Sequence, residues 1–422
     1  PAPLKFALIL LTALHDLGKI NADFRQMLHG RRSQGPRHWQ VTEVLLQRND
    51  DLLAARLGGR WQRRFPLYAA TAGHHGKPPD LSETDQKRSL TWIGKDALDD
   101  ARATIATFLD LWPEASLDSL QSEAEAKRLS WWLPGLVTTG DWIGSNTGWF
   151  PAHPPAPLPG YLSQTRARAK AAGLAGAPLL TGPLFDFALR PMQRACANIP
   201  LPEGPMLAVI EDESGAGKTE AALILAQRML AAGKGRGVYF ALPTMATWDA
   251  MFARAEGIVG RMFDGPSLAL AHGRAGLSEK FRDLIAGKAN APEDVSCTPW
   301  LADNRRRALL ADIGVGTIDQ ALLAALPTKF HTLRHYALSS KLLIVDEVHE
   351  LGEPYIGAVL ERLLALHRQA GGSAILLTAT LPLAQRARLL AVYQGASDDP
   401  AYPALTLAGG AARRDLPQHT GP

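Results

Sequence analysis

The first 150 residues carry apolar positions at the spacing of an α-helix. Apolar side chains recur three and four residues apart over 4–14, 41–57 and 96–111, which places them on one face of a helix. We find no segment in this part that predicts a strand. The pattern therefore predicts an all-α domain over residues 1–150.

A proline-rich stretch interrupts this pattern. Five prolines fall between Pro151 and Gly160, and neither a helix interior nor a central strand accommodates so many. A short basic helix over 164–172 is predicted to continue the connection. We assign residues 151–183 to a linker.

From about residue 184 onward, short apolar runs alternate with helical stretches. Helices fit at 220–232 and 354–370, and such alternation is typical of a parallel sheet covered by helices. We therefore predict a multidomain protein whose second domain, over 184–408, has an α/β fold, with a polar tail over 409–422. The runs predicted as strands are 206–210, 237–241, 267–271, 314–317, 342–345 and 374–377.

Composition narrows the class of protein. Of the 422 residues, 46% are hydrophobic and 20% are charged, which excludes a disordered or fibrous chain. The net charge of +4 permits a polyanionic partner without requiring one. Two cysteines are too few for a disulfide framework or a cysteine-ligated zinc. The longest apolar stretch, Leu4–Leu14, is too short to cross a bilayer, so we expect a cytoplasmic protein with no membrane partner.

Histidines and aspartates form four motifs in the helical part. Neutral imidazoles and carboxylates are natural ligands of borderline divalent metals. A single His-Asp pair is more often a surface or capping feature, but four such elements in one helical domain indicate a metal site. Two metals about 3.5–4 Å apart would activate a water for phosphodiester hydrolysis. The candidate ligands are His15, Asp16, His38, His74, His75 and Asp141.

The apolar run at 206–210 leads into a glycine-rich loop and then a helix, which is the context of a phosphate-binding loop. We expect Lys218 to reach the β- and γ-phosphates of a nucleotide and Thr219 to coordinate Mg²⁺. The full pattern has glycine where this chain has Asp212, so the acidic side chains there must point away from the phosphates. The candidate residues of the loop are Gly215, Gly217, Lys218 and Thr219.

Two further strands end in polar motifs. One delivers Asp346 to the carboxyl edge of the sheet, where Mg²⁺ would sit, and places Glu347 to polarise the attacking water. The other ends in Thr378 and Thr380, a pair that becomes specific because it follows an Asp-Glu-x-His run. Gln193, upstream of the loop, is a candidate to read an adenine edge.

Donors suited to nucleic-acid phosphates are expected at two other strand ends, in Ala241–Thr247 and Val315–Gln320. Both segments combine backbone N–H groups with hydroxyls. The candidate DNA contacts are Pro243, Thr244 and Thr317.

Together these residues resemble the CRISPR type I nuclease–helicase family. Its members fuse an HD-type metal nuclease to a superfamily 2 helicase and are recruited by the Cascade surveillance complex. HD phosphohydrolases and helicases are each common, but this order in one chain is not. The motifs that carry the resemblance are His15-Asp16-Leu17-Gly18-Lys19, Gly73-His74-His75-Gly76, Val315-Gly316-Thr317-Ile318-Asp319-Gln320 and Asp346-Glu347-Val348-His349.

The resemblance implies an activity and its cofactors. In this family the HD site binds two divalent transition-metal ions and cuts single-stranded DNA. The helicase half uses ATP with Mg²⁺ to pull one strand toward the nuclease. Residues 1–150 would then be the HD nuclease domain and 184–408 the first RecA-like helicase domain. The implied partners are single-stranded DNA and Cascade, and we expect a monomer.

The resemblance also assigns roles to residues. The six candidate ligands match the HD metal ligands, with Asp16 also catalytic, and Lys19 matches a catalytic phosphate contact. The phosphate-loop residues match the ATP contacts, Asp346 the Mg²⁺ carboxylate and Glu347 the catalytic base. The residues matched to the coupling of hydrolysis with DNA movement are His349, Thr378 and Thr380.

The chain departs from the family in two places. The family has another metal-binding histidine on a helix before the His-Asp pair, and the fourteen residues before His15 contain none. The family also continues into a second RecA-like domain with an arginine finger, for which the residues after Pro382 are too few. We therefore expect a partial member that binds nucleotide but hydrolyses it weakly, since losing an arginine finger costs about 10³–10⁵ in rate.

Two other functions stay open on the sequence. With half an ATP cleft and an incomplete metal shell, the chain would serve only as a module that docks on DNA or on Cascade. It would alternatively be an HD phosphohydrolase of small nucleotides. The fused Asp-Glu-x-His ATPase argues against this, because such an enzyme has no need of a DNA motor.

Overall fold

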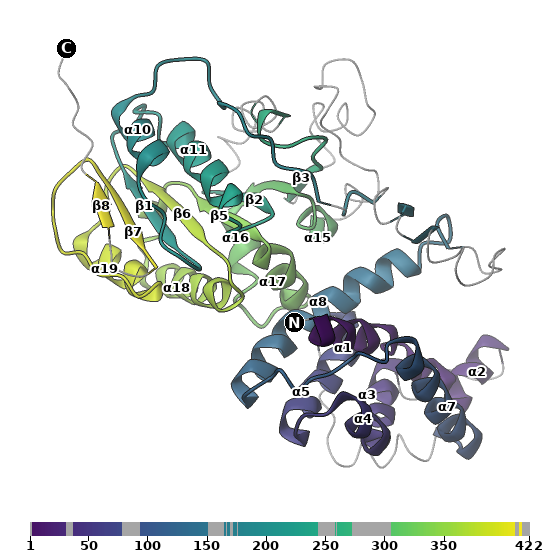
Figure 1. Cartoon of the computed structure of the whole chain (residues 1–422). Coiled ribbons are helices and arrows are strands. Elements are labelled where there is room, and N and C mark those ends of the chain that lie inside the picture. Colours follow the sequence, from purple (N-terminus) through teal and green to yellow (C-terminus); the bar gives the residue numbers. More distant parts are fainter. Residues whose placement is uncertain are drawn as a thin grey trace. The chain divides into compact units, whose positions relative to one another are not determined.

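The computed structural model divides the chain into two compact units. The first, called the helical unit, comprises Pro1–Ala152 together with Lys329–Tyr336. The second, called the sheet unit, comprises His153–Thr328 and Ala337–Pro422. Figure 1 shows the elements of each. The structure describes residues 2–30, 37–77, 93–150, 164–165, 167–168, 172–174, 176–243, 258, 260–271, 305–409 and 413–415.

The prediction of a helical N-terminal part is confirmed. Every element in the described part of residues 1–150 is an α-helix or a 3₁₀ helix. These elements are α1 (Ala2–Ala13), η1 (Leu17–Ile20), α2 (Ala22–Leu28), α3 (His38–Arg48), α4 (Asp50–Leu57), α5 (Trp61–Thr71), η2 (Ala72–His75), α7 (Lys95–Leu111) and α8 (Glu123–Gly144).

The single helix predicted over 41–57 is in fact two helices. α3 ends at Arg48 and α4 begins at Asp50, with Asn49 between them at φ −99° and ψ 21°. The Asn49 amide donates to the carbonyl of Leu45 at 2.9 Å, so its side chain competes with the helical backbone for hydrogen bonds. The spacing of apolar residues runs through this break and therefore does not reveal it.

One apolar cluster fills the centre of the helical unit. Leu10 of α1, Leu45 of α3, Leu67 of α5 and Leu133 of α8 belong to it and are fully buried. Burial of each such leucine contributes roughly 1.5–3 kcal/mol. This packing fixes the helix ends from which the polar candidates project.

An eight-stranded sheet forms the centre of the other unit. Its strands follow the order β3-β4-β2-β5-β6-β1-β7-β8, and neighbours from β3 to β1 are parallel. Each of these six strands overlaps a predicted run, and the α/β fold is confirmed. The strands are β1 (Leu207–Glu211), β2 (Gly237–Leu242), β3 (Leu268–Ala271), β4 (Ile313–Thr317), β5 (Lys341–Val345), β6 (Ala374–Thr378), β7 (Ala404–Ala408) and β8 (Arg413–Asp415).

Two strands at one edge of this sheet were not predicted. β7 runs antiparallel to β1, with Ala408 opposite Leu207, and β8 runs antiparallel to β7. β8 falls within the stretch 409–422 that the sequence predicted as a tail. Antiparallel edge strands on parallel sheets are common. β1 is far from β7 in the sequence, so no local sequence pattern predicts that the two strands pair.

Helices cover both faces of the sheet, with α10 and α11 over one face and α18 and α19 over the other (Figure 1). The connection from β1 to β2 and the connection from β5 to β6 lead in opposite directions across the sheet. Because both crossovers are right-handed, their helices α11 and α18 must lie on opposite faces. The carboxyl ends of the parallel strands therefore share one edge. The helices described after residue 190 are α10 (Pro191–Asn198), α11 (Lys218–Ala231), α15 (Arg305–Ala308), α16 (Ile318–Leu322), α17 (His331–Ser339), η4 (Val348–Leu351), α18 (Pro354–Gln369) and α19 (Leu383–Val392), and residues 331–336 of α17 belong to the helical unit.

The connection between the two parts is described only in pieces. The proline-rich stretch 151–160 lies outside the described residues, and within the predicted basic helix residues 164–165 and 167–168 are helical. Among the helices that the structure describes, none is both long and apolar enough to span a bilayer.

Glu43 is a buried carboxylate on α3. It is 4% exposed, its Oε1 accepts from the Gln47 amide at 2.9 Å, and its Oε2 has no hydrogen-bond partner among the described residues. Burial, opposed only in part by Gln47, raises the pKa of Glu43 from 4.5 to about 7. The folded protein therefore holds this proton more tightly than the unfolded chain does. Its stability falls as the pH rises from 4.5 to about 7.

The substitution Glu43→Gln should remove this cost. Above about pH 7 we expect the variant to be more stable by up to about 3 kcal/mol, since one pKa unit corresponds to about 1.4 kcal/mol, and to melt several degrees higher. Below the ordinary pKa of 4.5 the variant and the wild type should melt together. Thermal unfolding at both pH values measures this, with the exposed Glu114→Gln as control. Equal melting temperatures at high pH would contradict a buried charge at this position.

Candidate metal and nucleotide sites

His15 and Asp16 lie in the turn after α1. α1 ends at Ala13 and η1 begins at Leu17, with Asp16 at its N-cap position. Adjacent side chains inside a helix point about 100° apart, whereas at a helix end they can reach one point. The end of the first helix therefore lets both side chains face the same site.

Thr42 of α3 ties this turn to the helix that carries His38. Its hydroxyl lies 2.8 Å from the carbonyl of His15 and 3.2 Å from that of His38, and it accepts the Gly18 N–H at 2.9 Å. A Cβ on Gly18 would lie 1.9 Å from the carbonyl oxygen of His38. Glycine at this position lets η1 meet α3, and the contact brings His38 beside the His15-Asp16 turn.

The remaining candidate ligands come from η2 and α8. α5 passes directly into η2, which presents His74 and His75, and Asp141 lies near the C-terminal end of α8. The Thr138 hydroxyl, one turn before Asp141, lies 3.0 Å from the carbonyl oxygen of His74. This buried contact sets η2 against α8, and all six predicted ligands come together.

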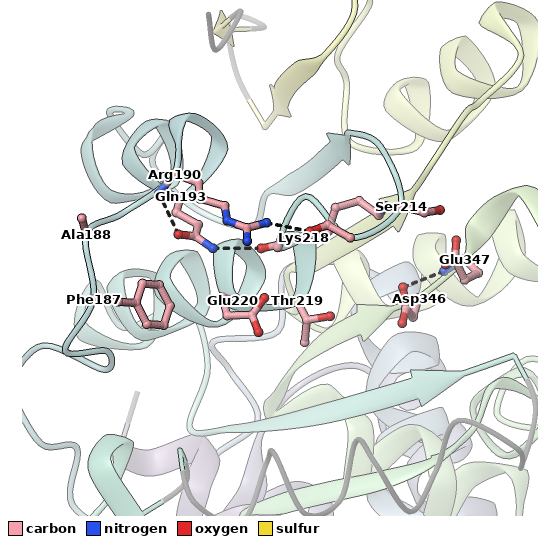
Figure 2. A pocket seen from close by; sticks show the side chains of 12 residues that line it. Phe187, Ala188, Arg190, Gln193, Ser214, Lys218, Thr219, Glu220, Asp346 and Glu347 are labelled. Atoms are coloured by element: carbon pink, nitrogen blue, oxygen red, sulfur yellow. Dashed lines mark hydrogen bonds between the residues drawn. The ribbon is translucent and has the colours of Figure 1, made fainter. Parts of the chain in front are cut away.

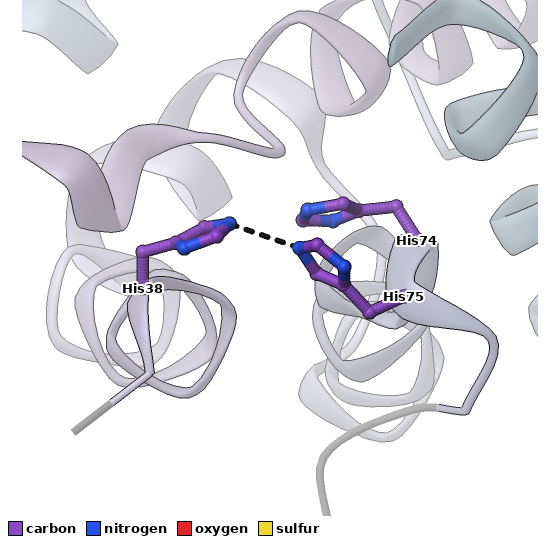
Figure 3. A group of neighbouring side chains, drawn as sticks. All are labelled: His38, His74 and His75. Atoms are coloured by element: carbon purple, nitrogen blue, oxygen red, sulfur yellow. Dashed lines mark hydrogen bonds between the residues drawn. The ribbon is translucent and has the colours of Figure 1, made fainter. Parts of the chain in front are cut away.

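The Asp16 carboxylate is the centre of the cluster. Its Oδ1 lies 3.4 Å from His38 Nε2 and 3.7 Å from His74 Nε2. Its Oδ2 lies 3.5 Å from His15 Nε2. The Nε2 atoms of His38 and His75 point toward each other at 3.1 Å, with the His74 ring beside them (Figure 3). One carboxylate thus faces three imidazoles, and it does so with two different oxygens.

The His15 imidazole sits between two carboxylates. Its Nδ1 lies 2.8 Å from the carbonyl of Thr12, which can only accept, so Nδ1 carries the proton. Its Nε2 lies 3.5 Å from Asp16 Oδ2 and 3.5 Å from Asp141 Oδ1. Burial lowers the pKa of His15, but Asp141, Asp16 and the Thr12 carbonyl outweigh it and raise the pKa above 6.5. The Asp141 pKa is lowered to about 2, because His15 more than offsets the effect of burial. A cation is therefore favoured between these groups.

His38 and His74 are held in the neutral form. Burial lowers the pKa of His38 to about 4, against the attraction of Asp16. Burial also lowers the pKa of His74 to about 3, and His15 and His75 add to this effect. A neutral imidazole keeps a lone pair for a metal, so both rings can act as ligands at neutral pH.

The donor atoms fit a divalent transition metal. Within the described residues, His15 Nε2, Asp16 Oδ1 and His74 Nδ1 are buried without a hydrogen-bond partner. Each such atom costs about 1–3 kcal/mol, and imidazole with carboxylate is a donor set that suits these metals. The ligand atoms fall into two groups, within each of which they lie less than 4.8 Å apart: His38, His74 and His75, and His15, Asp16 and His74.

Lys19, the predicted phosphate contact, lies on η1 beside the cluster. Its ammonium donates to Asp16 Oδ2, and its side chain is 41% exposed. The ammonium can therefore meet an anion that approaches the ligands from solvent.

The glycine-rich loop joins β1 to α11. Gly215 and Gly217 have φ values of 81° and 89°, in the left-handed region that glycine enters at low cost. α11 begins at Lys218, so its first N–H groups and the positive end of its dipole face the loop. A pocket of about 590 Å³ opens here (Figure 2), a volume typical of small-molecule sites.

The acidic run before this loop, Glu211–Glu213, lies outside the pocket wall. Glu211 pairs with the buried Arg386 at 3.0 Å, and Asp212 accepts the N–H of Glu213 at 2.8 Å. Neither Asp212 nor Glu213 lines the pocket. Lys218 Nζ donates to the backbone carbonyls of Asp212 and Glu213, at 2.9 Å in each case. Asp212 and Glu213 thus leave the pocket wall free of their charge, as the binding of a phosphate requires.

Gln193 and Arg190 brace the loop from α10. Gln193 Oε1 accepts the Arg190 N–H at 2.9 Å, and its Nε2 donates to the carbonyl of Gly217 at 3.4 Å (Figure 2). The Arg190 guanidinium donates to the carbonyl of Gly215 at 2.6 Å. Both side chains line the pocket together with Phe187. Gln193 therefore combines support of the loop with a place on the pocket wall.

Asp346 and Glu347 form another wall of the same pocket. Glu347 adopts φ 48°, which is strained for a residue with a side chain, and its N–H donates to Asp346 Oδ1 at 3.0 Å. His349 Nδ1 lies 3.4 Å from Glu347 Oε2 and 3.2 Å from Thr378 Oγ1. The Thr378 hydroxyl lies 2.6 Å from the carbonyl oxygen of Thr380. The predicted coupling residues thus form one chain of contacts from β5 to β6.

The predicted DNA contacts that the structure describes lie at neighbouring strand ends. Pro243 follows β2, and Thr317 ends β4. These two strands are paired, with Leu242 opposite Thr317. Thr244 lies outside the described residues.

Several residues of the two sites were not predicted. Thr42 and Thr138 hold the ligand-bearing elements together, and Phe187 and Arg190 line the nucleotide pocket. Only Arg190 stood next to a motif, as part of the Arg-Pro-Met-Gln run. Thr42 and Thr138 act through contacts between segments far apart in the chain, which no local pattern records.

Two family descriptions match the chain. Residues 2–150 match the family described as "Cas3, HD domain", and residues 190–389 match the family described as "DEAD/DEAH box helicase". The matches follow the order of the motifs along the chain.

Individual relatives give the same result. The chain is 30% identical to the "CRISPR-associated endonuclease/helicase Cas3" of Escherichia coli K12, over 98% of this chain and 52% of that protein. It is 32% identical to the protein of the same name from Thermus thermophilus, over 96% of this chain and 48% of that protein. A crystal structure of "T. fusca Cas3-AMPPNP" matches with a TM-score of 0.81 and 25% identity, over 99% of this chain and 51% of that one. The chain thus spans about half the length of the curated relatives it matches.

The substitution His74→Ala should weaken divalent-metal binding, because His74 belongs to both ligand groups. We expect Mn²⁺ affinity to fall by more than about 100-fold, beyond the cost of losing an outer-shell partner. Isothermal titration calorimetry measures this. His29→Ala, at the exposed end of α2, is the matched control and should bind as the wild type does. Equal affinity in both variants would contradict a metal at this cluster.

Proposed function

Because the chain belongs to the Cas3 family of CRISPR-associated nuclease–helicases, we propose that it is a CRISPR interference effector. In this proposal the domain at 1–150 cuts single-stranded DNA in a metal-dependent reaction. The domain at 184–408 is an ATP-dependent helicase, and 151–183 links the two. The observation that carries the proposal is the convergence of six predicted ligands on one point of the helical unit.

The chemistry of this cluster supports phosphodiester hydrolysis. Divalent ions, when bound, supply a water of lowered pKa and neutralise charge on the phosphodiester. His38 and His74, with pKa values of about 4 and 3, offer their lone pairs at neutral pH without first losing a proton. Lys19, exposed beside Asp16, would hold a phosphate of the strand against the ligands.

The proposal includes two ions. Asp16 faces His38 and His74 with one oxygen and His15 with the other. Its carboxylate is therefore able to bridge two ligand groups. Asp141, at 3.5 Å from His15, adds negative charge beside His15, which favours a second cation there.

The nucleotide pocket supports the helicase half of the proposal. Lys218 would bind the β- and γ-phosphates of ATP, Asp346 the magnesium ion, and Glu347 the attacking water. The contacts of His349 with Glu347 and Thr378 support a coupling role, since they join the water-orienting residue to another strand. The further nucleotide contacts that we propose are Gln193, Gly215, Gly217 and Thr219.

The proposal extends to partners. The moving DNA strand would contact Pro243 and Thr317, adjacent at the carboxyl edge of the sheet. Cascade would recruit the protein to its target, in the cytoplasm and as a monomer. The relatives' names, which join endonuclease, helicase and CRISPR association, support this assignment.

The substitution Asp16→Ala should abolish metal-dependent cleavage of single-stranded DNA. It removes both oxygens that face the imidazoles, so we expect the rate to fall by more than about 100-fold, beyond the cost of an outer-shell change. ATP binding should persist, because the nucleotide pocket has its own residues. Asp51→Ala, at an exposed carboxylate paired with Arg102, is the matched control. Cleavage that survives in Asp16→Ala would overturn the nuclease assignment.

The substitution Lys218→Ala should weaken ATP binding and leave metal-dependent cleavage of single-stranded DNA in place. Loss of a charge-assisted contact costs about 1.5–3 kcal/mol, or roughly 10- to 150-fold in affinity. Fluorescence titration with an ATP analogue measures this, with the exposed Lys127→Ala as control. Unchanged binding in Lys218→Ala would refute the phosphate-loop assignment.

A further inference from the structure

The segment Lys329–Tyr336 belongs to the helical unit, although it comes from the stretch between β4 and β5. Its Phe330 N–H donates to the carbonyl of Gly76 at 2.9 Å. The centroid of the Phe330 ring lies 6.0 Å from that of Trp142. This short segment therefore contacts both η2 and α8.

Gly76 and Trp142, both contacted by Phe330, are neighbours of candidate ligands. Gly76 directly follows His75, and Trp142 directly follows Asp141. His75 lies on η2 and Asp141 on α8. A group that contacts both elements can therefore fix the distance between these two side chains. Phe330 spans them with its backbone on one side and its ring on the other.

Two glycines make room for this segment. Gly76 has φ 102°, and a Cβ there would lie 2.9 Å from Lys329 Cγ and 3.0 Å from Phe330 N. A Cβ on Gly135 of α8 would lie 2.2 Å from Tyr336 Cβ. The backbones of η2 and α8 thus approach the segment more closely than residues with side chains would allow.

Aromatic contacts continue this packing along α8. The ring of Trp131 lies 5.0 Å from that of His331, and the ring of Trp132 lies 4.9 Å from that of Tyr336. Phe330 itself has φ 64°, a strained conformation that persists only where the surroundings enforce it. The segment is therefore packed along α8, and its strained residue contacts the chain neighbours of two candidate ligands.

We propose that Phe330 is a positioning residue of the nuclease centre. It holds η2 and α8 at the separation at which His75 and Asp141 can serve the same ions, and it acts through Gly76 and Trp142 without touching an ion. This inference rests on the metal centre proposed above.

The test uses the full 422-residue chain with Mn²⁺ as the probe. Phe330→Ala should weaken Mn²⁺ binding about 10- to 100-fold, the range for partners that orient ligands. The Mn²⁺ concentration for half-maximal DNA cleavage should rise by the same factor, while ATP binding stays unchanged. Phe330→Tyr, which keeps the ring, should restore both values. Phe65→Ala, at an exposed ring on α5, is the matched control and should bind Mn²⁺ as the wild type does.

A second pair of variants tests the backbone contact. Gly76→Ala meets Phe330, whereas Gly30→Ala has a similar positive φ, 68°, with nothing within 4 Å of the new Cβ. Gly76→Ala should weaken Mn²⁺ binding and Gly30→Ala should not. If wild type binds Mn²⁺ and both Phe330→Ala and Gly76→Ala bind it equally well, the inference is overturned and the metal centre stands. If wild type binds no Mn²⁺, the proposed metal centre itself fails, and this inference with it.

Discussion

The arrangement of the helical unit around its candidate ligands depends on one carboxylate, because Asp16 faces the imidazoles of His15, His38 and His74 at 3.4 to 3.7 Å. His15 Nε2 faces the carboxylates of Asp16 and Asp141, each at 3.5 Å. Burial makes each unpaired group more costly than it would be in water. The Thr42 hydroxyl accepts the Gly18 N–H, and the lack of a side chain at Gly18 lets η1 pack against α3. The atoms whose burial lowers the stability of this unit are therefore the same atoms that could bind a metal ion.

The sheet unit handles charge in the opposite way. Its phosphate loop offers backbone N–H groups and a helix end, and of the acidic run before the loop Glu211 is paired to Arg386. Lys218 Nζ donates hydrogen bonds to two carbonyls of the loop. A bound phosphate would accept hydrogen bonds from Lys218 in place of these carbonyls. The lysine of the pocket thus has hydrogen-bond partners in the absence of a nucleotide, whereas His15 Nε2, Asp16 Oδ1 and His74 Nδ1 of the ligand cluster are buried without one among the described residues.

The fold of each unit could be predicted from the sequence, because the spacing of apolar residues and the order of the motifs are visible in short segments of the chain. All six parallel strands follow apolar runs, and the six candidate ligands sit in short motifs. The break at Asn49 was missed because apolar spacing continues across it. β7 was missed because its partner β1 is remote in the chain, and the same reason hides Thr42 and Phe330. What stayed unpredictable is contact between distant segments.

The position of Lys329–Tyr336 in the chain has a consequence for how the protein is made. A ribosome adding about 5–20 residues per second completes Pro1–Ala152 well before it reaches this segment, a delay on the order of ten to forty seconds at that pace. During that interval the nascent chain carries all six ligands but lacks the piece that packs beside them. Maturation of the helical unit is therefore timed by translation of the sheet unit.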